Sequence, residues 1–494
     1  VLLLLIPVLA SAQTTFPFQN TSLPDSKRVD NLLSLMTIDE KVNALSTNLG
    51  IPRLGIRNTG HSEGLHGMAL GGPGNWGGTE RGVAKTYPTT IFPQAYGLGE
   101  TWDTELIQKV ADIEANEIRF YTQNANLQKG GLVMRAPNAD LARDPRWGRT
   151  EESYGEDAFL VSQLTVAFVK GLQGNNPKYW KSASLMKHFL ANSNEDGRDS
   201  TSSDFDERLF REYYSFPFYK GITEGGSRAF MASYNAWNGV PMTIHPVLKN
   251  ITRNEWGNNG IICTDGGALS LLVNAHKSFP TMTEGAAAVV KASVGQFLDN
   301  FRSYIYEALK QGLLTEKDID NAIRGNFQVA LKLGLLDADQ SMVPYAGIGV
   351  TDTVSPWNKP EVKAFVREVT AKSVVLLKNS NQLLPLNKSK LKSIAVIGPR
   401  ANEVLLDWYS GTPPYAVSIL QGIKNAVGKD VEVFYAPSDE MDKAALAARK
   451  ADVAIVCVGN HPYGTDARWK ISPVPSDGRE AVDRKAIALE QEDL

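Results

Sequence analysis

The sequence predicts an α/β protein in which a (β/α)8-type barrel, a TIM barrel, is followed by a doubly wound parallel sheet. Over about 300 residues, helical stretches alternate with short apolar runs that end in polar, glycine-rich turns. A stretch with several prolines interrupts this alternation, which then resumes. The 494 residues, 43% of them hydrophobic and 21% charged, are typical of a folded chain of two or three domains.

The chain divides into four predicted parts. Residues 1–12 are mostly apolar and end in an A-x-A cleavage site, so we expect an incomplete signal peptide and a secreted or periplasmic protein. Residues 13–336 are assigned to the barrel, 337–360 to a linker, and 361–494 to the second α/β domain. The last helical pattern stops without a C-cap, which predicts a second domain that is truncated here.

The predicted strands are apolar without alternation, as expected for parallel strands buried on both faces. In the barrel they cover residues 131–136, 183–188, 228–234 and 260–264. The predicted barrel helices cover residues 27–45, 102–122, 157–172, 207–224, 298–311 and 316–333. After the linker, strands at 393–397, 431–435 and 453–458 alternate with helices at 417–427 and 443–450.

Composition excludes several classes of protein. The 51 basic and 54 acidic residues give a net charge of −3, which favours neither nucleic acid nor an anionic membrane as a partner. No apolar run is long enough to span a bilayer. Both cysteines, Cys263 and Cys457, lie in apolar runs and are expected to be buried thiols rather than a disulfide.

No metal or cofactor is predicted. His61 and His66 lie beside Glu63, but no H-E-x-x-H pattern is present. The turn after the first strand of the second domain, Ile397-Gly398-Pro399-Arg400, lacks the G-x-G-x-x-G pattern of dinucleotide sites.

Polar residues cluster after the predicted barrel strands, at the rim where barrel enzymes carry their active sites. Residues 138–149 are densely charged, as expected for a site or for a salt-bridged loop. Lys187 and His188 end one predicted strand, and burying such polar groups is costly unless an anion or an array of hydroxyl groups contacts them. The alternative is a structural pair whose hydrogen bonds are satisfied within the protein. Asp265 ends another strand and is followed by two glycines, so it is either an exposed rigid carboxylate or a helix N-cap.

A further cluster, residues 230–239, alternates aromatic and amide side chains. Such a surface suits a sugar, which presents apolar C–H faces and hydroxyl edges, or it forms the edge of an aromatic core. These observations make a small-molecule carbohydrate the expected partner.

Four segments in this order, residues 142–149, 187–189, 233–239 and 262–265, together resemble glycoside hydrolase family 3, the β-glucosidase and β-xylosidase family. The resemblance implies a (β/α)8-like barrel followed by an (α/β)6 sandwich. It also implies retaining hydrolysis at the non-reducing end of β-linked sugars, with one carboxylate as nucleophile and one as general acid and base.

By this resemblance Asp265 is the nucleophile. Glu63 is expected to hold the far hydroxyls of the sugar; many β-glucosidases have Asp there, and Glu followed by Leu-His-Gly is closer to xylosidase-like members. The remaining residues expected around the sugar in the first subsite are Arg143, Lys187, His188, Arg198, Met231 and Tyr234.

The general acid is expected from the second domain. Some family members carry Glu in place of Asn460, and an amide cannot protonate a leaving group. Glu480 is therefore the predicted acid and base, with Asp466 and Asp477 as alternatives, although Glu480 could also be a solvated loop charge.

These inferences predict a secreted, exo-acting β-glucosidase, with β-xylosidase as the alternative. A non-catalytic sugar-binding protein that has lost the acid is the alternative from another class. The N-acetylglucosaminidase branch of the family is disfavoured, because residues 189–198 contain no histidine to carry its acid.

Overall fold

The structure is a computed structural model that describes residues 16–71, 87–437, 440–459 and 478–489, with the backbone of β2 (Thr79–Glu80) and β3 (Val83–Ala84). The predicted signal peptide, residues 1–12, lies outside the described residues, as do Asn460, Asp466 and Asp477. Export of the protein and any role of these three side chains therefore stay predictions.

The N-terminal part is built around two parallel sheets. One has the order β1-β4-β5, with β1 (His61–Glu63), β4 (Val133–Arg135) and β5 (Ala183–Ser184). The other has the order β11-β8-β6, with β6 (Met186–Phe189), β8 (Ala229–Ala232) and β11 (Ile261–Thr264), and every residue of these three strands is buried. Burial on both faces explains why these runs show no alternation.

A short backbone bridge connects the two sheets. A parallel bridge links Asn138, just after β4, to Lys187 in β6. Leu185 separates β5 from β6, and the pairing of β6 with β8 shifts register between Met186 and Phe189. Within the described residues the predicted strand 183–188 is therefore two short strands in two three-stranded sheets, and the closed eight-stranded barrel stays a prediction.

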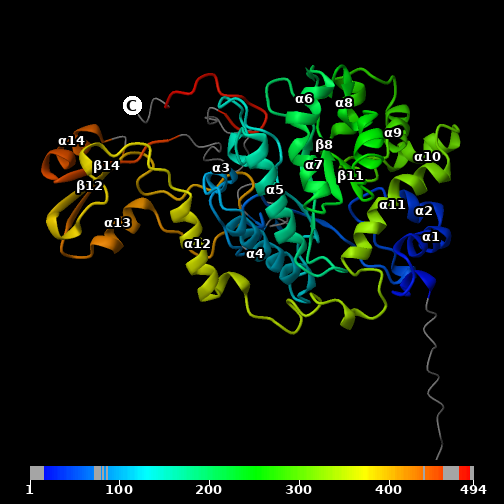
Figure 1. Cartoon of the computed structure of the whole chain (residues 1–494), viewed down its shortest axis with the longest axis horizontal. Helices are drawn as coiled ribbons and strands as arrows, with labels where there is room; N and C mark the ends of the chain where they lie inside the picture. The colour runs from blue at the N-terminus through cyan, green and yellow to red at the C-terminus, as the bar shows by residue number, and fades with distance from the viewer. Residues whose placement is uncertain are drawn as a thin grey trace, which may run out of the picture.

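Helices pack around these sheets in chain order. Figure 1 shows α4 (Thr104–Gln123), α5 (Ala158–Gln173) and α7 (Phe216–Thr223) side by side, and α4 contacts α5 as α5 contacts α7. Asp103 and Asp157 cap α4 and α5 through their side chains. Further helices of this part are α3 (Ala95–Gly99), α8 (Ala268–Asn274), α9 (Met282–Lys291), α10 (Arg302–Lys310) and α11 (Glu316–Lys332).

Two predicted helices are interrupted. The prediction for residues 27–45 is wrong at Thr37, where α1 (Asp25–Leu35) ends and α2 (Ile38–Asn43) begins, because Thr37 and Glu40 form a reciprocal capping box. The prediction for residues 207–224 resolves into α6 (Glu207–Leu209), a π-helical segment (Phe210–Tyr214) and α7. Pro217 at the start of α7 has no N–H to continue the preceding helix.

The C-terminal part begins with α12 (Pro360–Lys372), which the sequence interpretation did not predict. Its parallel sheet has the order β13-β12-β14, with the fully buried β12 (Ser393–Ile397) between β13 (Glu432–Ala436) and β14 (Val453–Val456). The helices α13 (Ile419–Val427) and α14 (Met441–Lys450) follow β12 and β13 as predicted. The three strands found in the described residues of this part do not make a complete (α/β)6 sandwich, which stays a prediction.

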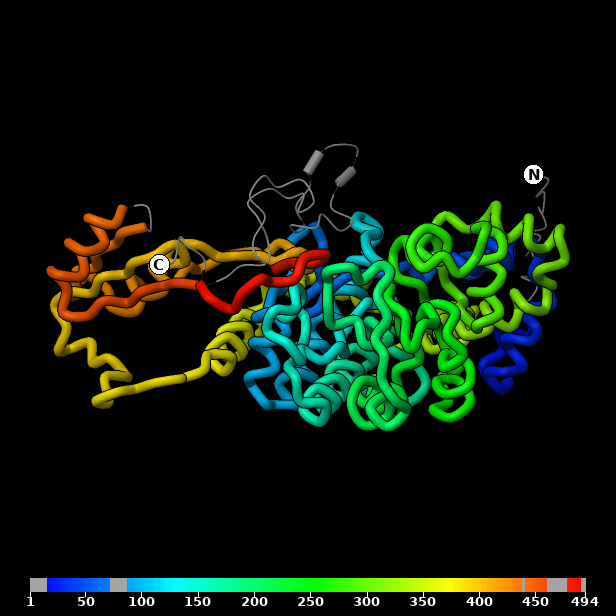
Figure 2. The backbone as a smooth tube through the Cα atoms, turned by 90° about the horizontal axis from the view of Figure 1, so that it is seen from above, coloured from blue at the N-terminus to red at the C-terminus, as the bar shows by residue number. Residues whose placement is uncertain are grey.

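The C-terminal sheet lies at one end of the molecule, but the chain returns from it to the N-terminal part. In Figure 2 the segment 478–489, in red, runs back across the N-terminal part of the molecule. Among the described residues, no helix is both long and apolar enough to cross a membrane.

Candidate active site

Asp265 follows β11 and faces a cluster of cationic and imidazole groups. Its Oδ2 lies 3.8 Å from His188 Nε2, and its Oδ1 accepts the backbone N–H of Gly266 at 2.7 Å. Asp265 does not cap the next helix, because Gly267 is the N-cap of α8. Burial raises the pKa of Asp265, while the nearby charges of Arg149 and Arg198 oppose that rise.

His188 is held in one orientation by Asp140. The Oδ2 atom of Asp140 accepts from the backbone N–H of His188 at 3.0 Å and from Nδ1 at 2.9 Å. With its proton on Nδ1, the ring presents a bare Nε2 to Arg149 Nη2 at 3.3 Å. Burial and the charges of Arg149, Lys187 and Arg198 hold the pKa of His188 well below its usual range, so the ring is neutral.

Arg149 is the arginine of the 138–149 loop that enters the site. Its Nε and Nη2 each donate to a carboxylate oxygen of Glu152 at 2.7 Å, and its side chain is 1% exposed. Arg143, which the sequence interpretation placed beside the sugar, is instead exposed on the same loop. In the structure, Arg149 therefore occupies the place in the site that was expected for Arg143.

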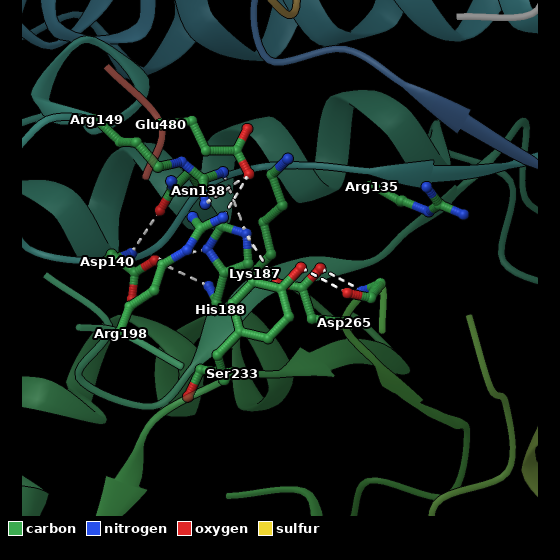
Figure 3. A network of polar contacts seen from close by, with 12 residues as sticks. Arg135, Asn138, Asp140, Arg149, Lys187, His188, Arg198, Ser233, Asp265 and Glu480 are labelled. Atoms are coloured by element: carbon green, nitrogen blue, oxygen red, sulfur yellow. Dashed lines mark hydrogen bonds and ion pairs between the residues drawn. The ribbon is translucent and has the colours of Figure 1, made fainter. Parts of the chain in front are cut away.

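Glu480 reaches this cluster from the C-terminal part of the chain. Its Oε1 lies 3.1 Å from Arg198 Nη2 and 3.9 Å from Arg149 Nη1, while its Oε2 accepts from the Tyr409 hydroxyl at 3.0 Å. Figure 3 shows Arg149, Arg198 and His188 between Glu480 and Asp265. The side chain of Glu480 is 14% exposed, so it is not the solvated loop charge of the alternative interpretation.

The charge state of Glu480 follows from these neighbours. Burial raises its pKa, but the positive charges of Arg149, Arg198 and Lys187 outweigh burial and lower the pKa to about 2. Glu480 is therefore ionised in this arrangement.

The segment that carries Glu480 is anchored by Asp483. Its carboxylate accepts the backbone N–H groups of Gly148 at 2.9 Å, Glu195 at 2.9 Å and Asp196 at 3.0 Å. Glu195 in turn accepts the N–H of Ala481 at 2.8 Å. A Cβ atom on Gly148 would lie 2.1 Å from the Val482 carbonyl oxygen, so the segment lies directly on the Gly148 backbone.

A second set of charges lies around Glu63 in β1. Lys187 Nζ lies 3.5 Å from Glu63 Oε2, and Arg135 at the end of β4 pairs with Glu63 Oε1. Lys187 and Glu63 are both buried, so each needs the other to offset the cost of losing water.

Tyr234 and Met231 come from β8 and the turn after it. The Tyr234 hydroxyl donates to the Gly266 carbonyl at 2.9 Å, and the guanidinium of Arg198 lies 4.9 Å from the centre of the Tyr234 ring. Met231 is 2% exposed and pairs in register with Cys263 on β11. Tyr234 therefore lines the site next to Asp265, while Met231 is part of the packed core beneath it.

The sequence interpretation missed several residues that build the site. Arg135 ends a buried strand, the same signal that selected Lys187, and could have been found by it. Asp140 and Arg149 lie inside the charged loop that was recognised, but their inward direction depends on the folded loop. Tyr409 carries no local signal, because its partners Lys187 and Glu480 are far away in the sequence.

The fold and the site define a two-part α/β protein whose C-terminal part completes a carboxylate site on its N-terminal part. Residues 78–326 match the glycosyl hydrolase family 3 N-terminal domain, and residues 374–494 match the family 3 C-terminal domain. The chain belongs to glycosyl hydrolase family 3, as its motifs predict.

Among curated proteins, a β-xylosidase of Formosa agariphila is 36% identical over 467 residues, covering 88% of this chain and 61% of that protein. A probable β-D-xylosidase 7 of Arabidopsis thaliana is 33% identical, covering 90% of this chain and 59% of the relative. The chain thus spans about 60% of the length of these curated relatives.

Solved structures share the fold. A family 3 exo-β-xylosidase in complex with a xylobiose aziridine activity-based probe matches with a TM-score of 0.79 and 27% identity, covering 95% of this chain and 59% of that one. A β-glucosidase from Erythrobacter marinus matches with a TM-score of 0.80 at 24% identity, covering 96% and 70%, which is a likeness of fold alone.

Proposed function

We propose that this chain carries the active site of a retaining, exo-acting β-glycosidase, in which Asp265 is the nucleophile and Glu480 the general acid and base. The observation that carries the proposal is that these two carboxylates, from distant parts of the chain, face the same cluster of Arg149, Arg198 and His188. A retaining glycosidase needs two carboxyl groups that flank the scissile bond.

In the first step the Asp265 carboxylate attacks the anomeric carbon, and the bond to the leaving-group oxygen breaks as Glu480 gives that oxygen a proton. The product is a glycosyl ester on Asp265. In the second step water, deprotonated by Glu480, hydrolyses the ester and releases the sugar with its original anomeric configuration.

The positive charges around Glu480 keep it ionised, which suits the second step of the reaction. An ionised Glu480 is ready to act as a base, whereas the first step needs it protonated. Arg149 and Arg198 are the two charges that lower the pKa of Glu480 most, and Arg198 also donates a hydrogen bond to its Oε1. The acid role therefore requires that sugar hydroxyls draw Arg198 away from Glu480 when the substrate binds, so that the pKa of Glu480 rises.

Glu195 is the other carboxyl group near Arg198, and burial raises its pKa to about 7. Its side chain is fully buried, however, and its oxygens accept from Trp147 Nε1, Arg198 Nη1 and the Ala481 N–H. Glu195 cannot reach a substrate, so we assign it to holding Arg198 and the Glu480 segment in place.

We propose that xylose fits the site better than glucose, which was the first expectation from the sequence. The names of the β-xylosidase relatives support this, and so does Glu63, whose side chain is one methylene longer than the Asp of many β-glucosidases. A longer side chain leaves less room for the hydroxymethyl group that glucose has and xylose lacks. The expected kcat/KM on an aryl β-xyloside exceeds that on the matching β-glucoside by about tenfold or more; a faster glucoside would refute the sugar assignment.

The reaction is tested with Asp265→Asn and Glu480→Gln. Asp265→Asn is expected to lower the hydrolysis of aryl β-xylosides by about 10⁴-fold or more, because the amide cannot form the ester. Glu480→Gln is expected to hydrolyse an activated dinitrophenyl xyloside with a burst, and azide should accelerate turnover by replacing the base-activated water. A non-catalytic sugar-binding protein would show no burst, and near-normal turnover by Asp265→Asn would refute the mechanism.

A further inference from the structure

The segment 407–412, between β12 and α13, is fixed onto the N-terminal part of the molecule. At one end the Asp407 Oδ2 accepts from His66 Nε2 at 3.0 Å and from Gln94 Nε2 at 2.7 Å. At the other end the Thr89 N–H donates to the Thr412 carbonyl at 2.9 Å. Between them Gly411 leaves no room for a side chain, since a Cβ there would lie 2.1 Å from Thr89 Oγ1.

This segment delivers Tyr409 into the candidate active site. The tyrosine is 8% exposed, its hydroxyl donates to Glu480 Oε2 at 3.0 Å, and Lys187 Nζ lies 4.0 Å from the centre of its ring. One side chain therefore touches both the carboxylate at the leaving-group end and the lysine that pairs with Glu63.

The hydroxyl of Tyr409 makes the two oxygens of Glu480 unequal. Oε2 receives the O–H of Tyr409, whereas Oε1 faces Arg198 and Arg149 on the side of the cluster that leads to Asp265. In the arrangement described, both oxygens accept hydrogen bonds, Oε1 from Arg198 and Oε2 from Tyr409. When Arg198 turns to the substrate, as the proposed acid role requires, only Oε2 keeps its donor, so the carboxyl group takes up its proton more readily on Oε1. That is the oxygen from which a proton can reach a leaving group beside Asp265.

We infer that Tyr409 is a positioning residue that holds the Glu480 carboxyl group with Oε1 as its proton-carrying atom. The inference rests on the proposed function, in that Glu480 is taken to be the acid and base. It assigns to the segment 407–412 a part in the reaction, since the segment fixes the orientation of a group carried by the separate segment 478–489.

The test compares Tyr409→Phe with the unaltered full-length protein on aryl β-xylosides of increasing leaving-group pKa. Phe keeps the ring beneath Lys187 and removes only the hydroxyl. We expect kcat/KM to fall about tenfold for phenyl xyloside and by less than about twofold for dinitrophenyl xyloside, because only the poor leaving group needs a well-aimed proton. The inhibition constant of free xylose should stay within about twofold, because the hydroxyl already donates to Glu480 and is therefore not expected to hold the sugar.

Tyr154→Phe is the matched control. Tyr154 is also buried, and its hydroxyl has no hydrogen-bond partner among the described residues, so its loss should leave all these quantities unchanged. If Tyr409→Phe slowed every xyloside by the same factor, or weakened xylose binding in proportion, the role would be structural and the inference overturned.

Glu480→Gln, measured on the same substrates, separates failure of this inference from failure of the proposed function. A strong leaving-group dependence for Glu480→Gln with none for Tyr409→Phe would refute only the positioning role. Absence of leaving-group dependence in Glu480→Gln would refute the acid role itself, and the inference with it.

Discussion

Replacing Asp483 by Ala should detach the segment that carries Glu480 while leaving the rest of the fold intact. The Asp483 carboxylate accepts three backbone N–H groups, two of them at 2.9 Å and one at 3.0 Å. Hydrogen bonds to a charged group contribute about 1.5–3 kcal/mol each when buried, but these are partly exposed and not additive. We therefore take about 3 kcal/mol as the lost docking free energy, which lowers the docking equilibrium constant of the segment by about 150-fold.

The assay is kcat/KM on phenyl β-xyloside, with dinitrophenyl β-xyloside as the substrate that needs little acid. Asp483→Ala is expected to lose about 10- to 100-fold on the first substrate and much less on the second. Lys485→Ala, two residues along the same segment and exposed, serves as the control. Unchanged kcat/KM on phenyl xyloside in Asp483→Ala would refute the reasoning that this anchor aims Glu480.

Two further predictions concern the contacts between the parts of the chain. Both ring nitrogens of His66 face oxygens, Phe92 O at 2.9 Å and Asp407 Oδ2 at 3.0 Å, so the ring is a cation. Burial lowers the pKa of His66, but the charge of Asp407 outweighs burial and raises it. The ion pair therefore stabilises the folded protein fully below about pH 6.5, the pKa of histidine in the unfolded chain. This stability is lost as the pH rises through the higher pKa of His66 in the folded protein. His66→Gln should therefore cost about 3 kcal/mol at pH 6, with a Tm difference from wild type that shrinks at alkaline pH; a constant difference would contradict the ion pair. Gly148→Ala should lower kcat/KM by about 100-fold, because its Cβ would meet the Val482 carbonyl at 2.1 Å and displace Glu480. Gly422→Ala in α13, whose nearest contact would be at 3.9 Å, should leave kcat/KM unchanged, and equal activities of the two variants would argue against a close docking.

Much of the site could be predicted from single strands. The sequence interpretation placed Asp265, Lys187 and His188 at the ends of buried apolar strands, where a charged or polar side chain needs a reason. In the structure Lys187 and His188 lie within β6 and Asp265 directly follows β11, and all three meet at one cluster. The cap at Thr37 was equally available from the sequence, since Thr37 and Glu40 have the spacing of a capping box.

The rest could not be predicted, because it depends on contacts between distant segments. Arg143 and Arg149 lie in one charged loop, and only the folded loop turns Arg149 toward Glu152 and His188 and leaves Arg143 in solvent. Tyr409 is positioned by the neighbouring Asp407, whose carboxylate contacts His66, a residue 341 positions away in the sequence. The local periodicity of a sequence does not predict contacts between residues that are so far apart in the chain.

The central claim is that Asp265 forms a covalent bond to the sugar during turnover. The most direct test incubates the protein with a 2-deoxy-2-fluoro β-xyloside that carries an activated leaving group, then locates the label by peptide mass spectrometry. The fluorine slows both steps, but the good leaving group lets the ester form faster than it is hydrolysed. We predict one fluoroxylosyl group on the peptide that contains Asp265, and its loss in Asp265→Asn. A label on another residue, or release of an inverted anomer from an ordinary substrate, would contradict the account.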